Sequence, residues 1–199
     1  MLPFDRVKIF VPPNKDNSMN KIKSKRPLPD GDKSTLLVID IQQGLFTRPT
    51  PIYHAEEFLR KVNALMDSAR AAGAPVIFIQ HANENLLARD TPGWQLHPQI
   101  KPLPGEPVIH KLQGNAFLDT NLADVLREKQ ASHLVLCGLV THGCVKSTCL
   151  GALELGYRVT LVQDGHSSFS KDAPQLIEAW NKKLGKAGAA LKTVEEVEF

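Results

Sequence analysis

Apolar residues along this chain form two alternating patterns, which are short continuous runs and longer stretches with helical spacing. Continuous apolar runs are typical of strands that are buried on both faces of a sheet. The runs lie at residues 35–40, 75–80, 107–111, 132–138, 158–164 and 189–194. The stretches between them place apolar residues three or four positions apart, which predicts helices. They lie at residues 55–73, 120–130, 144–156 and 173–188.

Strands that alternate with helices indicate a parallel sheet covered by helices. We therefore predict an α/β fold, a three-layer α/β/α sandwich around a six-stranded parallel sheet, over residues 34–199. Residues 1–33 show neither pattern and contain five prolines among scattered polar residues. We expect this segment to be a separate N-terminal arm.

Charge and composition narrow the classes of partner. The net charge is +3, and eight of the 24 basic residues lie in the first 33 positions, so the rest of the chain is near neutral. No aromatic or RNA-binding pattern accompanies this basic arm, which argues against nucleic-acid binding. No apolar run approaches the roughly 18 residues of a membrane span. Three cysteines do not make a disulfide framework, so we expect a cytoplasmic protein in a reducing setting.

Several polar residues stand where the predicted strands end. In open parallel sheets, ligands bind outside the carboxyl ends of the strands. Five residues with reactive or ionisable side chains fall at such positions, namely Asp40, His81, Lys111, Cys144 and Asp164. This end of the sheet is therefore the predicted site.

Cys144 stands at a turn between a strand and a helix. Unpaired backbone N–H groups and the positive end of a helix dipole favour the nucleophilic thiolate there. Lys111 would favour it further, and Asp40 could accept the thiol proton, so the three side chains make a consistent acyl-transfer centre. Each also has a structural alternative, because cysteines are often inert core residues, as we expect for Cys137 and Cys149. A lysine can likewise be a solvated charge. Asp40 and Asp164 can each be turn formers at a strand end, and Asp164 is followed by a glycine that suits a turn.

Metal and nucleotide sites find little support in the sequence. The seven histidines are scattered, and no H-x-x-x-H, H-E-x-x-H or C-x-x-C motif occurs. No glycine-rich phosphate or dinucleotide loop follows a strand. We predict neither a metal nor a cofactor.

Three segments together resemble the isochorismatase-like cysteine hydrolase superfamily. They are LLVIDIQQGLF (36–46), VIHKLQGNAF (108–117) and LVLCGLVTHGCVKSTCLGALELGYRVTLVQDGHSSF (134–169). The resemblance covers nearly all of residues 34–199 and implies the same α/β fold. It implies that Asp40 is the general acid/base, Lys111 the charge-stabilising lysine and Cys144 the nucleophile.

The resemblance also implies further site features. A cis peptide is expected at Leu139–Val140, and the backbone N–H groups of Val140 and Cys144 would form an oxyanion hole. Pocket-lining positions of the family correspond to Gln42, Phe46 and Phe117. We add Trp94, whose loop (residues 91–98) also contains His97 and is either a lid that contacts substrate or a packed surface turn.

The activity implied by the resemblance is hydrolysis of a small molecule. Nicotinamidases of the superfamily carry an Asp-x-His metal motif after the second strand, which FIQHANEN lacks. A cysteine nucleophile favours C–N over C–O cleavage, so a small amide, ureide or carbamoyl compound would react through a Cys144 thioester. The family forms oligomers, and we expect a homo-oligomer here. Two alternatives stay open, a vinyl ether hydrolase that needs no cysteine and a catalytically silent oligomeric scaffold.

Overall fold

The computed structural model describes residues 33–199, so the predicted arm lies outside the described residues except for Lys33. The centre of the fold is a six-stranded sheet in which all strands are parallel, in the order β3-β2-β1-β4-β5-β6. The strands are β1 (Ser34–Ile39), β2 (Val76–His81), β3 (Val108–Lys111), β4 (His133–Leu139), β5 (Arg158–Ser167) and β6 (Ala190–Lys192). The predicted sheet is therefore confirmed, with strand bounds that shift by one to three residues.

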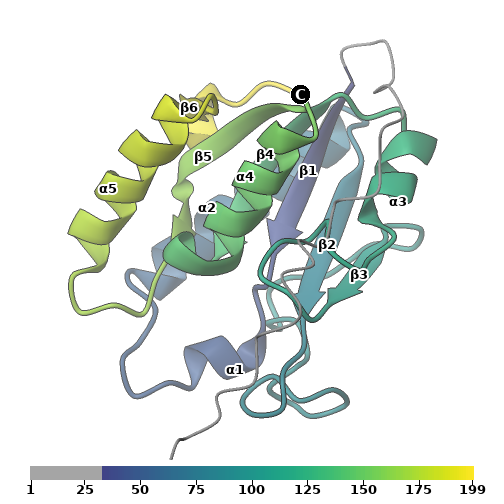
Figure 1. Cartoon of the computed structure of the whole chain (residues 1–199). Helices are drawn as coiled ribbons and strands as arrows, with labels where there is room; N and C mark the ends of the chain where they lie inside the picture. The colour runs from purple at the N-terminus through teal and green to yellow at the C-terminus, as the bar shows by residue number, and fades with distance from the viewer. Residues whose placement is uncertain (1–32) are drawn as a thin grey trace, which may run out of the picture.

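Helices cover both faces of the sheet (Figure 1). One face packs against α2 (Ala55–Ala71), and the other packs against α3 (Leu122–Glu128), α4 (Lys146–Glu154) and α5 (Ala173–Lys186). Alternate residues of β1 supply the two apolar cores, because successive side chains of a strand point to opposite faces. Leu36 and Val38 belong to the α2 side, and Leu37 and Ile39 to the other.

Strand β5 runs three residues further than its apolar pattern predicts. Asp164 and the glycine after it suggested a turn, but the strand continues through them to Ser167. The Asp164 side chain is held by other elements, because Oδ2 pairs with Nζ of Lys61 at 2.9 Å and Oδ1 accepts a hydrogen bond from the backbone of Val194. Asp164 is therefore a structural residue inside a strand, and its predicted place at a strand end was wrong.

The junction between β4 and α4 also differs from the predicted helix at residues 144–156. The regular helix begins at Lys146, and a wide π-type turn, η1 (Thr141–Val145), precedes it. Gly143 has non-helical backbone angles, with φ −109° and ψ −112°, and interrupts the turn. Cys144 therefore lies before the helix, in a turn that the spacing of apolar residues does not predict. Two short helices, α1 (Gln43–Phe46) and η2 (Val194–Glu196), were also not predicted.

The chain order places a topological switch between β1 and β4. From β1 the chain builds β2 and β3 on one side, then crosses to build β4 and β5 on the other. Such a switch opens a crevice at the carboxyl ends of the two central strands. The strands approach closely there, because a Cβ on Gly138 would lie 2.1 Å from the carbonyl oxygen of Ile39, and Gly138 has φ +126°. Glycine at this position lets the segments after β1 and β4 meet.

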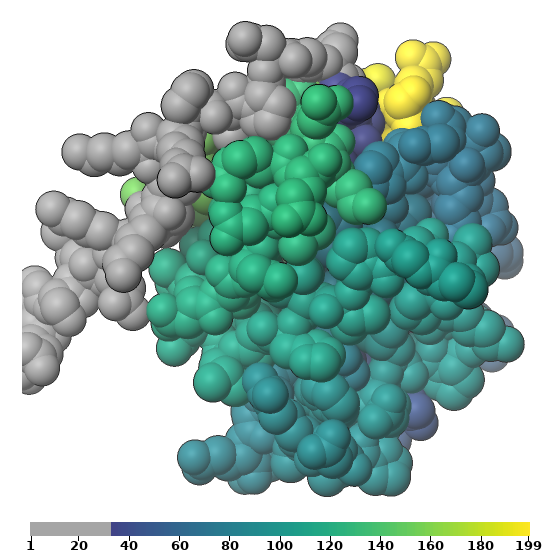
Figure 2. Space-filling view, turned by 90° about the vertical axis from the view of Figure 1, so that its right-hand side faces the viewer, coloured from purple at the N-terminus to yellow at the C-terminus, as the bar shows by residue number. Residues whose placement is uncertain are grey.

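The surface beside the β3 edge comes mainly from the middle of the chain (Figure 2). Teal and green residues dominate this view, and the C-terminal residues, in yellow, reach it only at the top. Among residues 33–199, no helix has the length and apolar character that a membrane crossing requires.

Candidate active site

Asp40, Lys111 and Cys144 meet at the carboxyl end of the sheet. Asp40 directly follows β1, Lys111 is the last residue of β3, and Cys144 lies in the turn after β4. Nζ of Lys111 donates to Oδ2 of Asp40 at 2.7 Å and contacts Sγ of Cys144 at 3.1 Å. Three segments that are far apart in sequence thus bring an acid, an ammonium group and a thiol into one cluster.

The cluster is largely withdrawn from water. Asp40 is 2% exposed and Lys111 is 1% exposed, whereas Cys144 is partly accessible. A buried carboxylate and a buried ammonium stabilise each other when they are paired and hydrogen-bonded. The second carboxylate oxygen, Oδ1 of Asp40, is buried and has no hydrogen-bond partner among the described residues. This oxygen is therefore the part of the carboxylate that Lys111 does not occupy.

The resting form of Cys144 is the neutral thiol. Burial raises the pKa of Cys144 to about 12, and the negative charge of Asp40 raises it too, whereas Lys111 acts in the opposite direction. Lys111 thus favours the thiolate as we expected, but burial and the charge of Asp40 outweigh it, so the net shift of the Cys144 pKa is upward. A nearby base must take the thiol proton before Cys144 can act as a nucleophile.

His81 joins the cluster as a fourth member. Its Nδ1 lies 3.2 Å from Nζ of Lys111, which also contacts the carbonyl oxygen of Gln113 at 3.2 Å. Burial lowers the pKa of His81, and the charge of Lys111 lowers it further, so the imidazole is neutral at pH 7. Its place at the end of β2 was visible in the sequence, but nothing there assigned it a role.

The side chains of this cluster that could bind a metal ion already contact the ammonium group of Lys111. One ligand atom each from Asp40, His81 and Cys144 lies within 4.8 Å of the other two, a set that could surround a metal ion. The ammonium group of Lys111 contacts all three residues. The cluster is thus arranged around a side-chain cation.

Gln42 links two segments beside this cluster through hydrogen bonds of its buried side chain. Its fully buried amide donates to the carbonyl oxygens of His81 and Trp94 at 2.8 and 2.6 Å and accepts from the backbone N–H of His81 at 2.9 Å. This side chain therefore ties β2 to the loop at residues 91–98. A contact between Gln42 and substrate stays a prediction.

The other predicted pocket residues lie in two different places. Phe46 packs against His97 with ring centroids 4.5 Å apart, and Trp94 packs edge-on against His110 at 4.9 Å. Trp94 and His97 lie in the loop at residues 91–98, whereas Phe46 ends α1 and His110 lies in β3. A role of Phe46 and Trp94 in substrate binding, or of the loop as a lid, stays a prediction. Phe117 is 6% exposed and stacks on a core tyrosine, so the structure places it in the packed interior under α3 and α4.

The turn that carries Cys144 is anchored to β5. The peptide bond between Leu139 and Val140 is cis, and the carbonyl oxygen of Val140 accepts from the backbone N–H of Gly143 at 2.9 Å. Oγ1 of Thr141 lies 3.0 Å from the carbonyl oxygen of Ser167 and 2.9 Å from Nδ1 of His166. Position 140 and the turn that carries Cys144 are thus held by the strand beside them.

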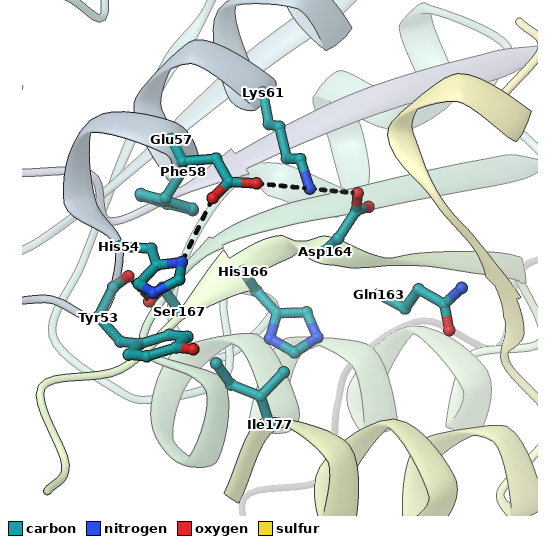
Figure 3. A pocket seen from close by; sticks show the side chains of 10 residues that line it. All are labelled: Tyr53, His54, Glu57, Phe58, Lys61, Gln163, Asp164, His166, Ser167 and Ile177. Atoms are coloured by element: carbon teal, nitrogen blue, oxygen red, sulfur yellow. Dashed lines mark hydrogen bonds and ion pairs between the residues drawn. The ribbon is translucent and has the colours of Figure 1, made fainter. Parts of the chain in front are cut away.

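A separate cavity of about 180 Å³ opens between the N-terminal end of α2, β5 and α5 (Figure 3). Lys61 pairs there with Glu57 at 3.2 Å and with Asp164, and His54 contacts Glu57. The buried His166 in its wall already contacts Thr141 and Asn181. The charged groups of this cavity are therefore partnered within the chain, and Asp40, Lys111 and Cys144 are not among its lining residues.

Comparison with known proteins agrees with this geometry. The chain is 34% identical over 167 residues to a streptothricin hydrolase from Streptomyces noursei, a match that covers 82% of this chain and 66% of that protein. It thus spans just under two thirds of this relative. A ureidoacrylate amidohydrolase from Caulobacter segnis is 25% identical over 177 residues, which covers 69% of this chain and 74% of that protein.

Solved structures and a family model extend the comparison to most of the chain. An isochorismatase family protein has a TM-score of 0.75 at 30% identity, covering 80% of this chain and 98% of its own. An isochorismatase from Pseudomonas putida KT2440 has a TM-score of 0.76 at 28% identity, covering 87% and 94%. The model of the isochorismatase domain matches residues 34–196. The chain therefore belongs to the isochorismatase family.

Proposed function

We propose that this protein hydrolyses a C–N bond of a small amide, ureide or carbamoyl substrate through a thioester on Cys144. The observation that carries the proposal is the position of the Lys111 ammonium, which contacts both Oδ2 of Asp40 and Sγ of Cys144. A base, a cation and a thiol in mutual reach are the parts that covalent acyl transfer requires.

The first half of the reaction forms the thioester. Oδ1 of Asp40, which has no partner among the described residues, takes the thiol proton of Cys144, and the ammonium of Lys111 stabilises the thiolate. The sulfur attacks the substrate carbonyl carbon, and the backbone N–H groups of Val140 and Cys144 stabilise the oxyanion. Protonated Asp40 then gives its proton to the leaving nitrogen, which departs as ammonia or an amine.

The second half of the reaction releases the product. Asp40 accepts a proton from a water molecule, and the resulting hydroxide attacks the thioester carbonyl. The C–S bond breaks, the acid product leaves, and the sulfur of Cys144 regains a proton from Asp40. The sum is addition of one water across the C–N bond, which restores the resting thiol and carboxylate.

The relatives support this reaction class. One is named a ureidoacrylate amidohydrolase and another a streptothricin hydrolase. The buried ion pair beside a reachable thiol also argues against a catalytically silent scaffold. A homo-oligomeric state and a cytoplasmic location stay predictions, and light scattering of the purified chain would test the first.

The test is a screen for ammonia or amine release from small amides, ureides and carbamates. We expect Cys144→Ala to lower the rate of the best substrate by at least about 10³-fold, as loss of a nucleophile does in other hydrolases. Cys149→Ala is the matched control, because Cys149 is a core residue on the next helix and should change kcat little. Undiminished activity in Cys144→Ala would contradict the thioester and favour the ether-hydrolase alternative.

A further inference from the structure

Nζ of Lys111 faces more acceptors than it has hydrogens. An ammonium group offers three N–H bonds. Four acceptor atoms lie within 3.2 Å of it, which are Oδ2 of Asp40, Sγ of Cys144, Nδ1 of His81 and the carbonyl oxygen of Gln113. The direction of these three bonds decides whether the positive charge points at the reacting sulfur.

His81 supplies one of these acceptors as a side chain rather than as backbone. Nδ1 accepts from an ammonium only when it carries no proton, so this contact places the ring proton on Nε2. A neutral thiol is a weak acceptor, so Asp40, His81 and Gln113 hold the three N–H bonds in the resting site. When Cys144 becomes a thiolate, Nζ already lies 3.1 Å from the sulfur.

The ionisable groups around His81 come from three parts of the chain. Asp40 follows β1, Lys111 ends β3, and Cys144 lies in η1. Half-burial of the ring disfavours the charged imidazolium most strongly, and Lys111 disfavours it too, whereas Asp40 and a hydrogen bond to the backbone of Gln113 favour it. The neutral ring is thus the form that fits between these groups at pH 7.

We propose that His81 is a positioning residue, whose neutral Nδ1 holds the ammonium of Lys111 against Cys144 and whose protonation at acid pH releases it. This inference rests on the proposed function of the same site. An imidazolium has no free electron pair on Nδ1 and would put a second positive charge 3.2 Å from Nζ. Lys111 would then lose one of its three acceptors and turn away from the sulfur.

Two substitutions at position 81 distinguish the effect of losing the acceptor atom from the effect of protonating His81. His81→Asn keeps an acceptor, the side-chain amide oxygen, near the position of Nδ1 and cannot be protonated between pH 5 and 8. His81→Leu fills a similar volume without an acceptor. His110→Asn is the matched control, because His110 is also a histidine whose pKa burial lowers, and it lies beside Lys111 on β3 with its ring against Trp94.

The readout is the rate at which iodoacetamide alkylates Cys144, followed by peptide mass between pH 5 and 7.5. This rate needs no substrate, so it tests the inference even if no amide is hydrolysed. At pH 7.5 we expect a loss of about tenfold in His81→Leu, recovery to within about threefold in His81→Asn, and no change in His110→Asn. The ratio of the wild-type rate to the His81→Asn rate should fall toward the acid end of this range, because only the wild type can lose its acceptor by protonation.

Two outcomes would overturn the inference. One is a His81→Leu variant that is alkylated as fast as the wild type, and the other is a wild-type to His81→Asn ratio that stays constant from pH 7.5 to 5. If His81→Leu does not fold, the pH dependence of the wild-type to His81→Asn ratio still tests the inference. With a hydrolysed substrate, His81→Leu should lower kcat and leave KM unchanged. Cys144-dependent hydrolysis with wild-type kcat in both His81 variants would remove this inference and keep the proposed function.

Discussion

Nζ of Lys111 lies 2.7 Å from Oδ2 of Asp40, and neither residue is more than 2% exposed. The two residues are 71 positions apart in the chain and come from strands β3 and β1, which are separated by β2. A buried pair of this kind costs free energy to desolvate, so it is weak evidence for stability. Its place beside Cys144 suggests that it is kept for chemistry.

The first prediction concerns the stability of this pair. Lys111→Met leaves the Asp40 carboxylate buried without its partner and should lower the free energy of unfolding by about 3–5 kcal/mol. Asp40→Asn combined with Lys111→Met removes both charges, so the double variant should be more stable than the sum of the single changes implies, by about 1–3 kcal/mol. Urea denaturation of all four proteins at pH 7 measures this coupling. Strictly additive losses of unfolding free energy would show that the two side chains do not stabilise each other.

The second prediction concerns the approach of β4 to β1. Gly138→Ala would place a Cβ 2.1 Å from the carbonyl oxygen of Ile39, at φ +126°. We expect both unfolding free energy and hydrolysis to fall, because the segments that carry Asp40 and Cys144 must move apart. Gly105→Ala is the control, since Gly105 has φ +88° with open space around it and should cost only about 1–2 kcal/mol. Equal losses of stability and activity in the two variants would contradict the argument.

The third prediction concerns His166, the buried histidine that contacts Thr141 in η1 and lines the cavity of Figure 3. Burial lowers the pKa of His166 to about 4, whereas the unfolded value is about 6.5. Between these values the unfolded chain binds more protons, so the native state loses stability as the pH falls. His166 should account for about 2 kcal/mol of the loss between pH 7 and pH 5.

The measurement compares wild type with His166→Gln, which does not titrate. Urea denaturation at pH 7 and pH 5 gives the difference in unfolding free energy between the two proteins. That difference should shrink by about 2 kcal/mol at the lower pH. A difference that is the same at both pH values would mean that His166 keeps an ordinary pKa in the fold.

Much of the fold could be predicted because the strands are buried on both faces. Runs such as the one at residues 36–39 are apolar throughout, and such a run can be recognised from the local sequence alone. The rule that ligands bind at strand carboxyl ends then selected Asp40, Lys111 and Cys144, which the structure brings together. It also selected Asp164, wrongly, because a salt bridge to Lys61 lets the strand continue through a dipeptide that usually turns.

Features that depend on tertiary contacts could not be predicted from local pattern. The amide of Gln42 bonds to backbone groups 39 and 52 positions away, and no local spacing records such contacts. The neutral state of Cys144 follows from how deeply the turn is buried, which the sequence does not show. The role of His81 likewise depends on where Nζ of Lys111 points.

The most direct test of the central claim is to trap the covalent intermediate. Wild-type protein mixed with a hydrolysed amide, ureide or carbamate is quenched in acid during turnover and digested, and the peptide that contains Cys144 is weighed. The account predicts that this peptide gains the mass of the substrate's acyl or carbamoyl group, and that the Cys149 residue carries none of it. A peptide of unmodified mass throughout rapid turnover, together with full activity in Cys144→Ala, would contradict it.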